Sequence, residues 1–300
     1  MGLPALRALA ALFPGRLSLI CVPGARRDLF ADVPLRSVCE VEMRHRGRGR
    51  VFDSRHAAET IGQCDLLVSL NPWHSPSVDR LLRLLSPARS VGFSPAFDVV
   101  LPKDSKRHVA DQVFALATHF DSSLRIEDFA FPPRLPRRCD PRIREFLESV
   151  APGKRVLAVH NETKPEKVWP RERLMRLIDA FLDRHPDFVA FVLDFYPWKG
   201  RKPHRRVIHS PGLPLHYAFS VLRASDVFLG VDSCMLHAAD LYRLPGVGLF
   251  GRANIGFASK TYNYRQWGFR FSRRRQISDA RGMNYIRETR VLAALEGLLT

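Results

Sequence analysis

Residues 228–251, FLGVDSCMLHAADLYRLPGVGLFG, constrain the fold of this 300-residue chain more than any other segment. An apolar run ends at Val231, a polar turn follows at Asp232 and Ser233, and a short helical stretch leads to a second apolar run that ends at Gly251. Strand, turn, helix and strand in this order predict a parallel βαβ unit. The N–H groups at the start of such a helix lie at the carboxyl end of the sheet, where phosphates bind well. Asp-Ser is also an ordinary helix cap, so a binding site and a cap remain equally open.

This segment resembles the nucleotide-sugar motif of glycosyltransferase family 9, the ADP-heptose:lipopolysaccharide heptosyltransferases, which reads roughly G-x-D-[ST]-G-x-x-H-x-A-A and then P-x-x-x-L-F-G. The residues that fit are Gly230, Asp232, Ser233, His237, Ala238, Ala239, Pro245, Leu249, Phe250 and Gly251. Cys234 departs from the motif, because the family has glycine there and glycine lets the backbone approach a phosphate closely. The resemblance implies that Asp232, Ser233, Cys234 and His237 bind the donor. A structural role for the helical His237 is the alternative.

A second motif lies at residues 160–170, HNETKPEKVWP, directly after an apolar run. It resembles a family segment in which K-x-W-P follows a strand, with Lys167, Trp169 and Pro170 in place. Proline suits the first turn of the helix that follows. The resemblance implies that Thr163 and Lys167 contact the donor phosphates, and a loop with surface charges is the alternative. We expect Trp169 to pack in the core rather than to take part in catalysis.

The first half of the chain resembles the family more loosely. Residues 3–24 are similar to its T-P-A-L-R-A-L helix and the strand after it, and residues 64–93 to a D-L-V-I-D-L-Q…R-I-G-F segment. Asn71, Trp73 and His74 follow an apolar strand, so we expect them at the carboxyl end of a sheet as an acceptor-side surface. A packing role for Trp73 is the alternative.

One departure concerns the general base. Family members begin with a strand and a Gly-Asp turn before the T-P-A-L-R helix, and the aspartate of that turn is the family's expected base. This chain opens at Met1 inside that helix, so we expect the first domain to lack its first strand. Inverting transfer needs a base that deprotonates the acceptor hydroxyl, and His74 is a better-placed substitute than Asp28 or Asp53. We therefore expect the chain to bind a nucleotide sugar and to transfer it slowly or not at all.

Strand-like and helix-like patterns alternate along the chain, which predicts an α/β fold with parallel sheets. Apolar runs at residues 155–160 and 227–231 are among the predicted strands. Residues 131–141, FPPRLPRRCDP, are too rich in proline for a helix or a central strand and are typical of a linker. We expect an acceptor-side domain over residues 1–135 and a donor domain over residues 136–300. The resemblance implies that both are Rossmann-like and face each other across a cleft, as in GT-B glycosyltransferases.

The formal net charge of +17 favours an anionic partner. The basic residues are mostly scattered arginines without the aromatic signatures of RNA-binding modules, which favours phosphorylated substrates or an anionic membrane surface over nucleic acid. The five cysteines never form C-x-x-C, which favours a reducing compartment and argues against zinc. No run of about 18 uncharged apolar residues occurs, so no transmembrane helix is expected. We expect a cytoplasmic protein, and peripheral contact with the inner face of the cytoplasmic membrane remains open.

Together these features predict an inverting glycosyltransferase that uses a nucleotide-diphosphate sugar, with an ADP-sugar favoured. The acceptor would be a glycan, a glycolipid such as lipopolysaccharide, or a small molecule. No metal-binding D-x-D or H-E-x-x-H occurs, so no metal and no cofactor is expected, and protein cations and helix dipoles would stabilise the leaving diphosphate. The alternative is a degenerate GT-B protein that binds a nucleotide sugar or a partner without turnover. A weaker third hypothesis, a nucleic-acid-associated protein, requires salt-sensitive binding.

Overall fold

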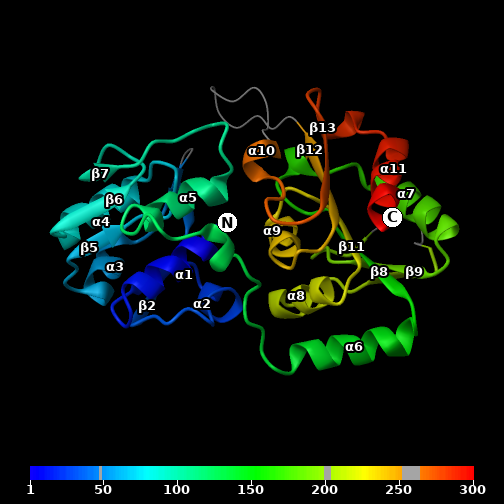
Figure 1. Ribbon diagram of the computed structural model, residues 1–300, viewed down its shortest axis with the longest axis horizontal. Helices are drawn as coiled ribbons and strands as arrows, with labels where there is room; N and C mark the ends of the chain where they lie inside the picture. The colour runs from blue at the N-terminus through cyan, green and yellow to red at the C-terminus, as the bar shows by residue number, and fades with distance from the viewer. Residues whose placement is uncertain (47–48, 199–203, 252–263) are drawn as a thin grey trace. The chain divides into compact units, whose positions relative to one another are not determined.

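The computed structural model describes residues 1–46, 49–198, 204–251 and 264–300 (Figure 1). The chain divides into two compact units, Met1–Arg134 and Leu135–Thr300. Each unit contains parallel strands that alternate with helices along the chain, which confirms the predicted α/β class. None of the helices in the described ranges has the length and apolar character needed to cross a membrane.

The second unit contains one six-stranded parallel sheet. Its strands are β8 (Arg155–His160), β9 (Phe188–Val192), β10 (Val207–His209), β11 (Val227–Val231), β12 (Gly246–Gly251) and β13 (Arg274–Asp279). Their order across the sheet is β10-β9-β8-β11-β12-β13, and every neighbouring pair is parallel. The chain therefore moves outward from β8 in one direction, returns to β11 beside β8, and moves outward in the other direction. This is the strand order of a doubly wound fold, and its direction reverses between β8 and β11.

Continuous apolar runs explain why the central strands of this sheet lie inside. Every residue of β9, β11 and β12 is buried, and so is β8 after Arg155. Strands covered on both faces by helices read as uninterrupted apolar segments, as these do. The helices and short 3₁₀ turns of the unit are α6 (Cys139–Val150), η2 (Pro165–Lys167), α7 (Arg171–Arg184), α8 (Leu215–Arg223), α9 (Cys234–Leu241), α10 (Tyr264–Trp267), η3 (Met283–Tyr285) and α11 (Glu288–Leu299).

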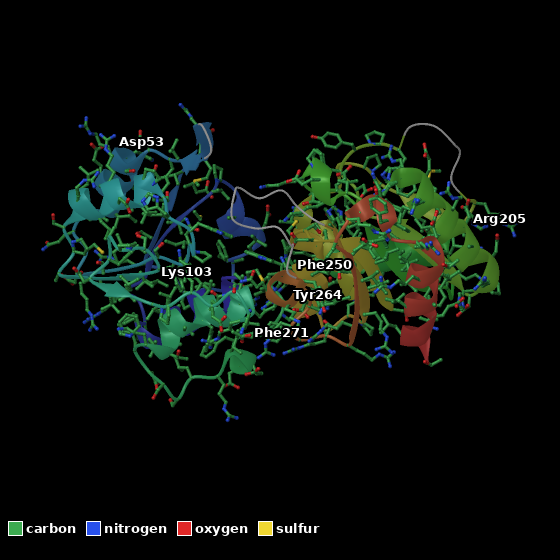
Figure 2. All side chains as sticks on the ribbon, turned by 90° about the horizontal axis from the view of Figure 1, so that it is seen from above. Asp53, Lys103, Arg205, Phe250, Tyr264 and Phe271 are labelled. Atoms are coloured by element: carbon green, nitrogen blue, oxygen red, sulfur yellow. The ribbon has the colours of Figure 1, made fainter. Side chains whose placement is uncertain are left out.

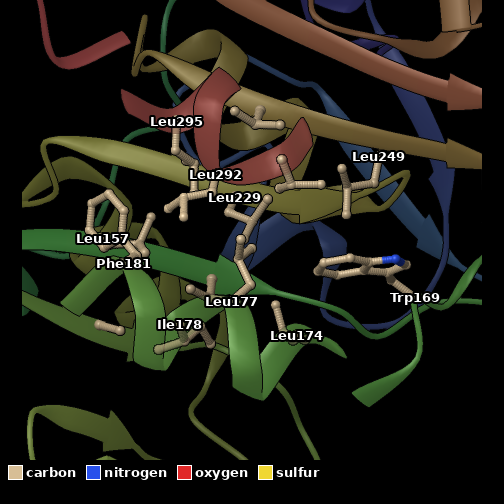
Figure 3. Close-up of a cluster of buried hydrophobic side chains, with 14 of the residues drawn as sticks. Leu157, Trp169, Leu174, Leu177, Ile178, Phe181, Leu229, Leu249, Leu292 and Leu295 are labelled. Carbon is tan, nitrogen blue, oxygen red and sulfur yellow. The ribbon is translucent and has the colours of Figure 1, made fainter. Parts of the chain in front are cut away.

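The main core of the second unit lies between the sheet and the helices α7 and α11 (Figure 3). Phe181 of α7 and Leu295 of α11 lie in it with Leu157 of β8 and Leu229 of β11, and all four are almost completely buried. Elsewhere in the unit, Phe250 at the end of β12 and Tyr264 at the start of α10 lie together (Figure 2), with their ring centroids 6.3 Å apart.

The first unit has its strands in separate sheets in the part of the chain that the structure describes. Its strands are β1 (Ser18–Cys21), β2 (Ser37–Glu40), β3 (Arg44–Arg46), β4 (Gly49–Val51), β5 (Leu66–Val68), β6 (Arg89–Gly92) and β7 (Val99–Val100). β1 pairs with β2 in parallel, β5, β6 and β7 form a parallel sheet, and β3 and β4 form an antiparallel pair. Its helices are α1 (Leu3–Leu12), α2 (Ala25–Asp28), α3 (Ser54–Ile61), α4 (Pro76–Leu85), α5 (Val109–Thr118) and the 3₁₀ turn η1 (Ile126–Asp128).

The two small parallel sheets of the first unit share a layer of helices. Ile20 of β1 and Leu67 of β5 pack against the same buried cluster, to which α3 contributes Ala57 and α4 contributes Leu81. All residues of β1 and β5 are only half-buried. These strands therefore lack the full cover that the central strands of the second unit have.

The predicted linker ends earlier than expected, because α6 begins at Cys139. Residues 139–141 of the proline-rich stretch form the first turn of this helix. Pro141 is the third helical residue, where the N–H that proline lacks would have no intrahelical partner, so proline is tolerated there. Cys139 and Ile143 are buried and fix the helix on the second unit. The prediction that proline excludes a helix from the whole stretch is wrong for its last three residues.

Candidate functional site

A lysine and an aspartate meet where the sheet of the second unit reverses direction. Lys167 lies in η2, in the loop after β8, and Asp232 follows the last residue of β11. The Nζ atom of Lys167 lies 2.5 Å from Oδ2 of Asp232, and both side chains are largely buried. Ligands of doubly wound folds bind at this point, outside the carboxyl ends of the two central strands. Two residues that the sequence separates by 65 positions are thus brought together at the edge where a ligand is expected.

His237 is the third charged or titratable group at this site, and it also lies near Asp232. It lies one helical turn into α9, and its Nε2 atom is 3.7 Å from Oδ1 of Asp232. The Asp232 carboxylate therefore has an ammonium near one oxygen and an imidazole near the other. The Ser233 side chain makes no capping hydrogen bond to α9, so the helix-cap interpretation is wrong for Ser233.

Ser233 has a polar group for which the fold provides no partner. It stands at the N-cap position of α9 with extended backbone, φ −156° and ψ 174°, yet its side chain accepts no helix N–H. Its Oγ atom is buried and has no hydrogen-bond partner among the described residues. An unsatisfied buried polar group costs about 1–3 kcal/mol. The first N–H groups of any α-helix also lack intrahelical partners, so a hydroxyl and a helix N-terminus are both available to an anion here.

A buried polar network fixes the loop that carries Lys167. The Asn161 side chain donates to the carbonyl of Trp169 at 2.8 Å and accepts the N–H of Trp169 at 3.0 Å, which closes the loop across its base. The backbone N–H of Asn161 donates to Oδ1 of Asp194 at 2.7 Å, and Asp194 also accepts the indole N–H of Trp198. Asn161 is a site-supporting residue that sequence reasoning missed. A polar residue directly after a buried strand is the pattern that indicates it.

Two exposed aromatic side chains lie at the same carboxyl end of the sheet. Phe195 and Tyr196 follow β9, the neighbour of β8, and are 60% and 68% exposed. The Glu162 carboxylate, from the Lys167 loop, accepts the backbone N–H groups of both residues. Their ring centroids are 5.3 Å apart. This segment is therefore tied to the loop that carries Lys167, while its rings stay open to solvent.

The other donor-side predictions have mixed outcomes. Thr163 is half-buried in the Lys167 loop. Cys234 is exposed at the first position of α9. Trp169 is completely buried in the core, and its indole N–H donates to the carbonyl of Ile286 at 3.2 Å. The expected packing role of Trp169 is confirmed.

The predicted acceptor-side residues lie in the loop between β5 and α4 of the first unit. Oδ1 of Asn71 accepts the backbone N–H of Trp73 at 3.1 Å, which forms an Asx turn. The Trp73 side chain is 60% exposed, so it has no core-packing role. His74 bonds to Asp79 in the first turn of α4. Over the described ranges, no group of three or more His, Cys, Asp and Glu side chains is arranged to hold a metal ion.

No family model matches the sequence, and no curated protein matches it. Among solved structures, the chain is similar to a glycosyl transferase family 9 protein from Veillonella parvula, with 16% identity and a TM-score of 0.75 over 99% of this chain and 92% of that one. It is also similar to E. coli ADP-heptose lps heptosyltransferase II, with 15% identity and a TM-score of 0.67 over 99% and 94%. E. coli heptosyltransferase WaaC with ADP gives 13% identity and a TM-score of 0.63 over 99% and 94%. The resemblance to glycosyltransferase family 9 is thus confirmed as a shared fold over nearly the whole chain.

Proposed function

We propose that the protein is a GT-B glycosyltransferase whose second unit binds a nucleotide-diphosphate sugar. The observation that carries this proposal is the partnerless Oγ atom of Ser233, at the N-terminus of α9 and next to the aspartate that holds Lys167. A diphosphate supplies the partner that the Ser233 hydroxyl lacks, and its oxygens also accept hydrogen bonds from helix N–H groups and from an ammonium. The shared fold supports the same function, and one of the similar heptosyltransferases was solved with ADP.

Lys167, Ser233 and the start of α9 would stabilise the charge that develops on the leaving nucleoside diphosphate. Thr163 and His237 are the further donor-side candidates, and Asp232 positions the Lys167 ammonium through their 2.5 Å contact. The transfer would be inverting and would need no metal. We favour an ADP-sugar as donor, heptose-like or with another sugar, and a glycan, lipopolysaccharide or small-molecule acceptor held by the first unit. The protein would act in the cytoplasm, with peripheral contact at the anionic inner membrane face.

A second candidate function is nucleotide-sugar binding without turnover. Cys234 favours this second function. It occupies the first position of α9, where glycosyltransferase family 9 has a glycine, and a glycine there lets the backbone come close to a phosphate. The substitution Cys234→Gly separates the two functions. An increase in affinity for the diphosphate, together with the appearance of transfer, would show that the cysteine keeps the present site from a productive geometry.

The proposal is tested by calorimetric titration with ADP, UDP and GDP. Lys167→Ala is expected to weaken the binding of the preferred nucleotide roughly ten- to a hundredfold, because a charge-assisted hydrogen bond contributes on the order of 1.5–3 kcal/mol. Lys164→Ala is the matched control, since Lys164 is an exposed lysine of the same loop. The proposal fails when none of the three nucleotides binds, or when the two lysine variants behave alike.

Ser233→Ala provides a sharper test of the same site. Removing a buried hydroxyl without a partner is expected to leave the unliganded protein equally stable or slightly more stable, by up to about 1 kcal/mol. The same change is expected to weaken ADP binding several-fold, because the hydroxyl would then no longer donate to a phosphate. A loss of stability without a change in ADP affinity would show that Ser233 is a structural residue.

A further inference from the structure

The edge strand β13 and the start of α11 carry a cluster of arginines that the donor site does not use. Five exposed arginines, which we call the cationic edge, lie on or directly before β13 and at the start of α11: Arg273, Arg274, Arg275, Arg287 and Arg290. The helix packs beside the strand (Figure 1), and the Arg290 guanidinium donates to the carbonyl of Ser278 in β13 at 3.3 Å. The cations therefore follow one edge of the sheet over the six residues of β13, a length of about 20 Å.

The fold leaves these charges without acidic partners. In the part of the chain that the structure describes, Arg273, Arg274 and Arg290 donate to backbone carbonyls, and none of the five guanidiniums pairs with a carboxylate. The nearby carboxylates are occupied, because Asp279 binds Arg281 at 2.9 Å and Glu288 binds Arg176 at 2.7 Å. Residues 264–300 contain eight Arg and no Lys against three Asp and Glu, which gives a formal net charge of +5.

Protection of a sheet edge does not account for so many charges. A charged side chain on an edge strand keeps other strands from pairing with it, but a row of like charges repels itself and destabilises the folded chain. Other surface arginines of the second unit have acidic neighbours. Arg223 pairs with Asp140 at 2.6 Å, and Arg155 lies within 4 Å of both Asp187 and Asp226. The unbalanced charge at β13 therefore indicates an anionic partner outside the chain.

One exposed aromatic side chain lies near these cations. Tyr285, in η3, is 50% exposed, and the Arg281 guanidinium lies 4.5 Å from the centroid of its ring. Tyrosine is enriched at membrane interfaces, because its ring is apolar while its hydroxyl stays in water. Proteins that bind single-stranded nucleic acids instead present several aromatic side chains, on which successive bases stack. A strip of arginines with one tyrosine fits the headgroup layer of an anionic bilayer better than it fits a nucleic acid.

We propose that the cationic edge binds the anionic surface of a lipid bilayer, with Tyr285 in the headgroup layer. Guanidinium groups suit this partner, because each can donate two parallel hydrogen bonds to a phosphate. The inference goes beyond the proposed function by assigning the surface that makes the peripheral membrane contact. β13 lies two strands away from β11, about 10 Å across the sheet. Binding through this edge thus holds the donor site close to the membrane, and its use for a glycolipid acceptor rests on the proposed function.

The test is sedimentation of the full chain with vesicles of phosphatidylcholine alone and of phosphatidylcholine mixed equally with phosphatidylglycerol. We expect binding to the anionic vesicles only. This binding should weaken as the ionic strength rises from about 0.1 M to about 1 M, because the Debye length falls from about 10 Å to about 3 Å. A variant with Arg274→Gln, Arg275→Gln and Arg287→Gln is expected to lose about 10²-fold in vesicle affinity, since each basic residue near an anionic membrane contributes roughly fivefold.

The matched control removes the same charge elsewhere in the unit. A variant with Arg137→Gln, Arg138→Gln and Arg144→Gln changes three exposed arginines at the start of the second unit, and it is expected to keep most of the vesicle affinity. Tyr285→Ser is expected to weaken vesicle binding several-fold. All changed side chains are exposed, so we expect the thermal unfolding and the ADP affinity of each variant to match those of the wild type.

Three results would overturn the inference. The wild-type protein could bind both kinds of vesicle alike or neither, the two triple variants could lose vesicle affinity equally, or a single-stranded DNA oligonucleotide could bind the cationic edge more tightly than the anionic vesicles do at the same salt concentration. Failure of the proposed function is a separate result. In that case the wild-type protein binds anionic vesicles through the cationic edge but binds no nucleoside diphosphate.

Discussion

The two units cover their parallel strands to different degrees. In the second unit, β8 and β11 each have a parallel neighbour on both sides, and nearly all their residues are buried. In the first unit, β1 and β5 each pair with one neighbour in the described part of the chain, and all their residues are half-buried. A strand edge without a partner leaves backbone N–H and C=O groups that need water or another partner. Full burial of a strand therefore depends on hydrogen-bonded neighbours on both sides as much as on its apolar side chains.

The same difference affects how each unit holds its candidate site. Lys167 and Asp232 follow the two central strands of a continuous, packed sheet, Lys167 in the turn η2 after β8 and Asp232 directly after β11. His74 stands on a loop with a hydrogen bond of its own from Asn71 to Trp73, and His74 bonds to Asp79 of α4. Local polar contacts hold both loops, and in the second unit the loop also follows a strand with a parallel neighbour on each side.

The second unit, which carries the proposed diphosphate site, also carries most of the positive charge of the chain. Residues 1–134 contain 18 Lys and Arg against 14 Asp and Glu, whereas residues 135–300 contain 29 against 16. The formal net charges are therefore +4 and +13. A strongly positive unit attracts anions from solution and speeds their association. The unit with the candidate diphosphate site is the one that carries most of the excess charge.

The largest expected difference between the units concerns their exposed and buried tryptophans. Trp169→Ala is expected to lower the free energy of unfolding by about 3–5 kcal/mol, because it removes a completely buried indole from the core. Trp73→Ala removes an exposed indole and is expected to change stability by about 0.5 kcal/mol or less. Denaturant unfolding followed by circular dichroism measures both. Equal losses would contradict the contrast drawn between the two units.

A buried arginine is expected to be the main polar support of the first unit. The Arg7 guanidinium, on α1, pairs with Asp32 at 2.8 Å and donates to the carbonyls of Phe129, Phe131 and Pro132. Burial lowers the pKa of Arg7 below its usual value even though Asp32 lies beside it. Arg7→Met leaves Asp32 without its cation and is expected to cost about 3 kcal/mol, as for other broken buried pairs.

The control for Arg7 is a pair on the surface of the second unit. Arg184 and Glu296 lie 3.2 Å apart on α7 and α11, and both side chains are substantially exposed. Arg184→Met is expected to cost about 1 kcal/mol or less. Thermal unfolding of the two variants makes the comparison. A larger loss for Arg184→Met would show that the packing between these helices, and not the sheet, holds the second unit together.

The strands that were predictable are those with continuous apolar runs. β8 and β11 occur at the predicted residues, because apolar runs such as RVLAVH and VFLGV are typical of strands buried inside a sheet. β13, with the sequence RRQISD, was not predicted. It is an edge strand, and edge strands carry charged side chains that hide their periodicity. Its Arg274 and Arg275 are exposed, which a sequence pattern alone reads as a solvated loop.

The sequence predicted which residues form the candidate site, but not that Lys167 and Asp232 contact each other. Lys167 and Asp232 were singled out because they match the family motifs and each follows a strand. Their 2.5 Å contact, however, depends on β8 lying next to β11. Sheet order is set by tertiary packing, and no local pattern reveals it. The bond from His74 to Asp79 was missed for another reason. Asp79 reads as an ordinary acidic residue in the first turn of α4, where the helix dipole favours it.

Amide hydrogen exchange is expected to show the difference between the sheets directly. Amides of β8 and β11 should be protected about 10²-fold more than those of β1 and β5, which corresponds to roughly 2.7 kcal/mol in opening free energy. Exchange measured by mass spectrometry on peptides that cover these strands makes the test. Equal protection would show that β1 and β5 gain partners in solution that their ladders here do not provide.

The smallest expected effect is on ADP affinity, and it compares the exposed aromatic side chains of the two units. Phe195 and Tyr196 are held beside the Lys167 loop by Glu162, at the end of the strand next to β8. A nucleotide whose diphosphate lies at Lys167 and α9 can extend its base across this neighbouring strand, about 4.8 Å away, and stack on one of these rings. Tyr196→Ala and Phe195→Ala are each expected to weaken ADP binding about fivefold, or roughly 1 kcal/mol. Tyr196→Phe keeps the ring and should bind ADP as the wild type does. Trp73→Ala should also bind it equally well, because Trp73 belongs to the first unit, to which we assign the acceptor and not the nucleotide. An ADP affinity that depends on Trp73 and not on residues 195 and 196 would reverse the roles assigned to the two units.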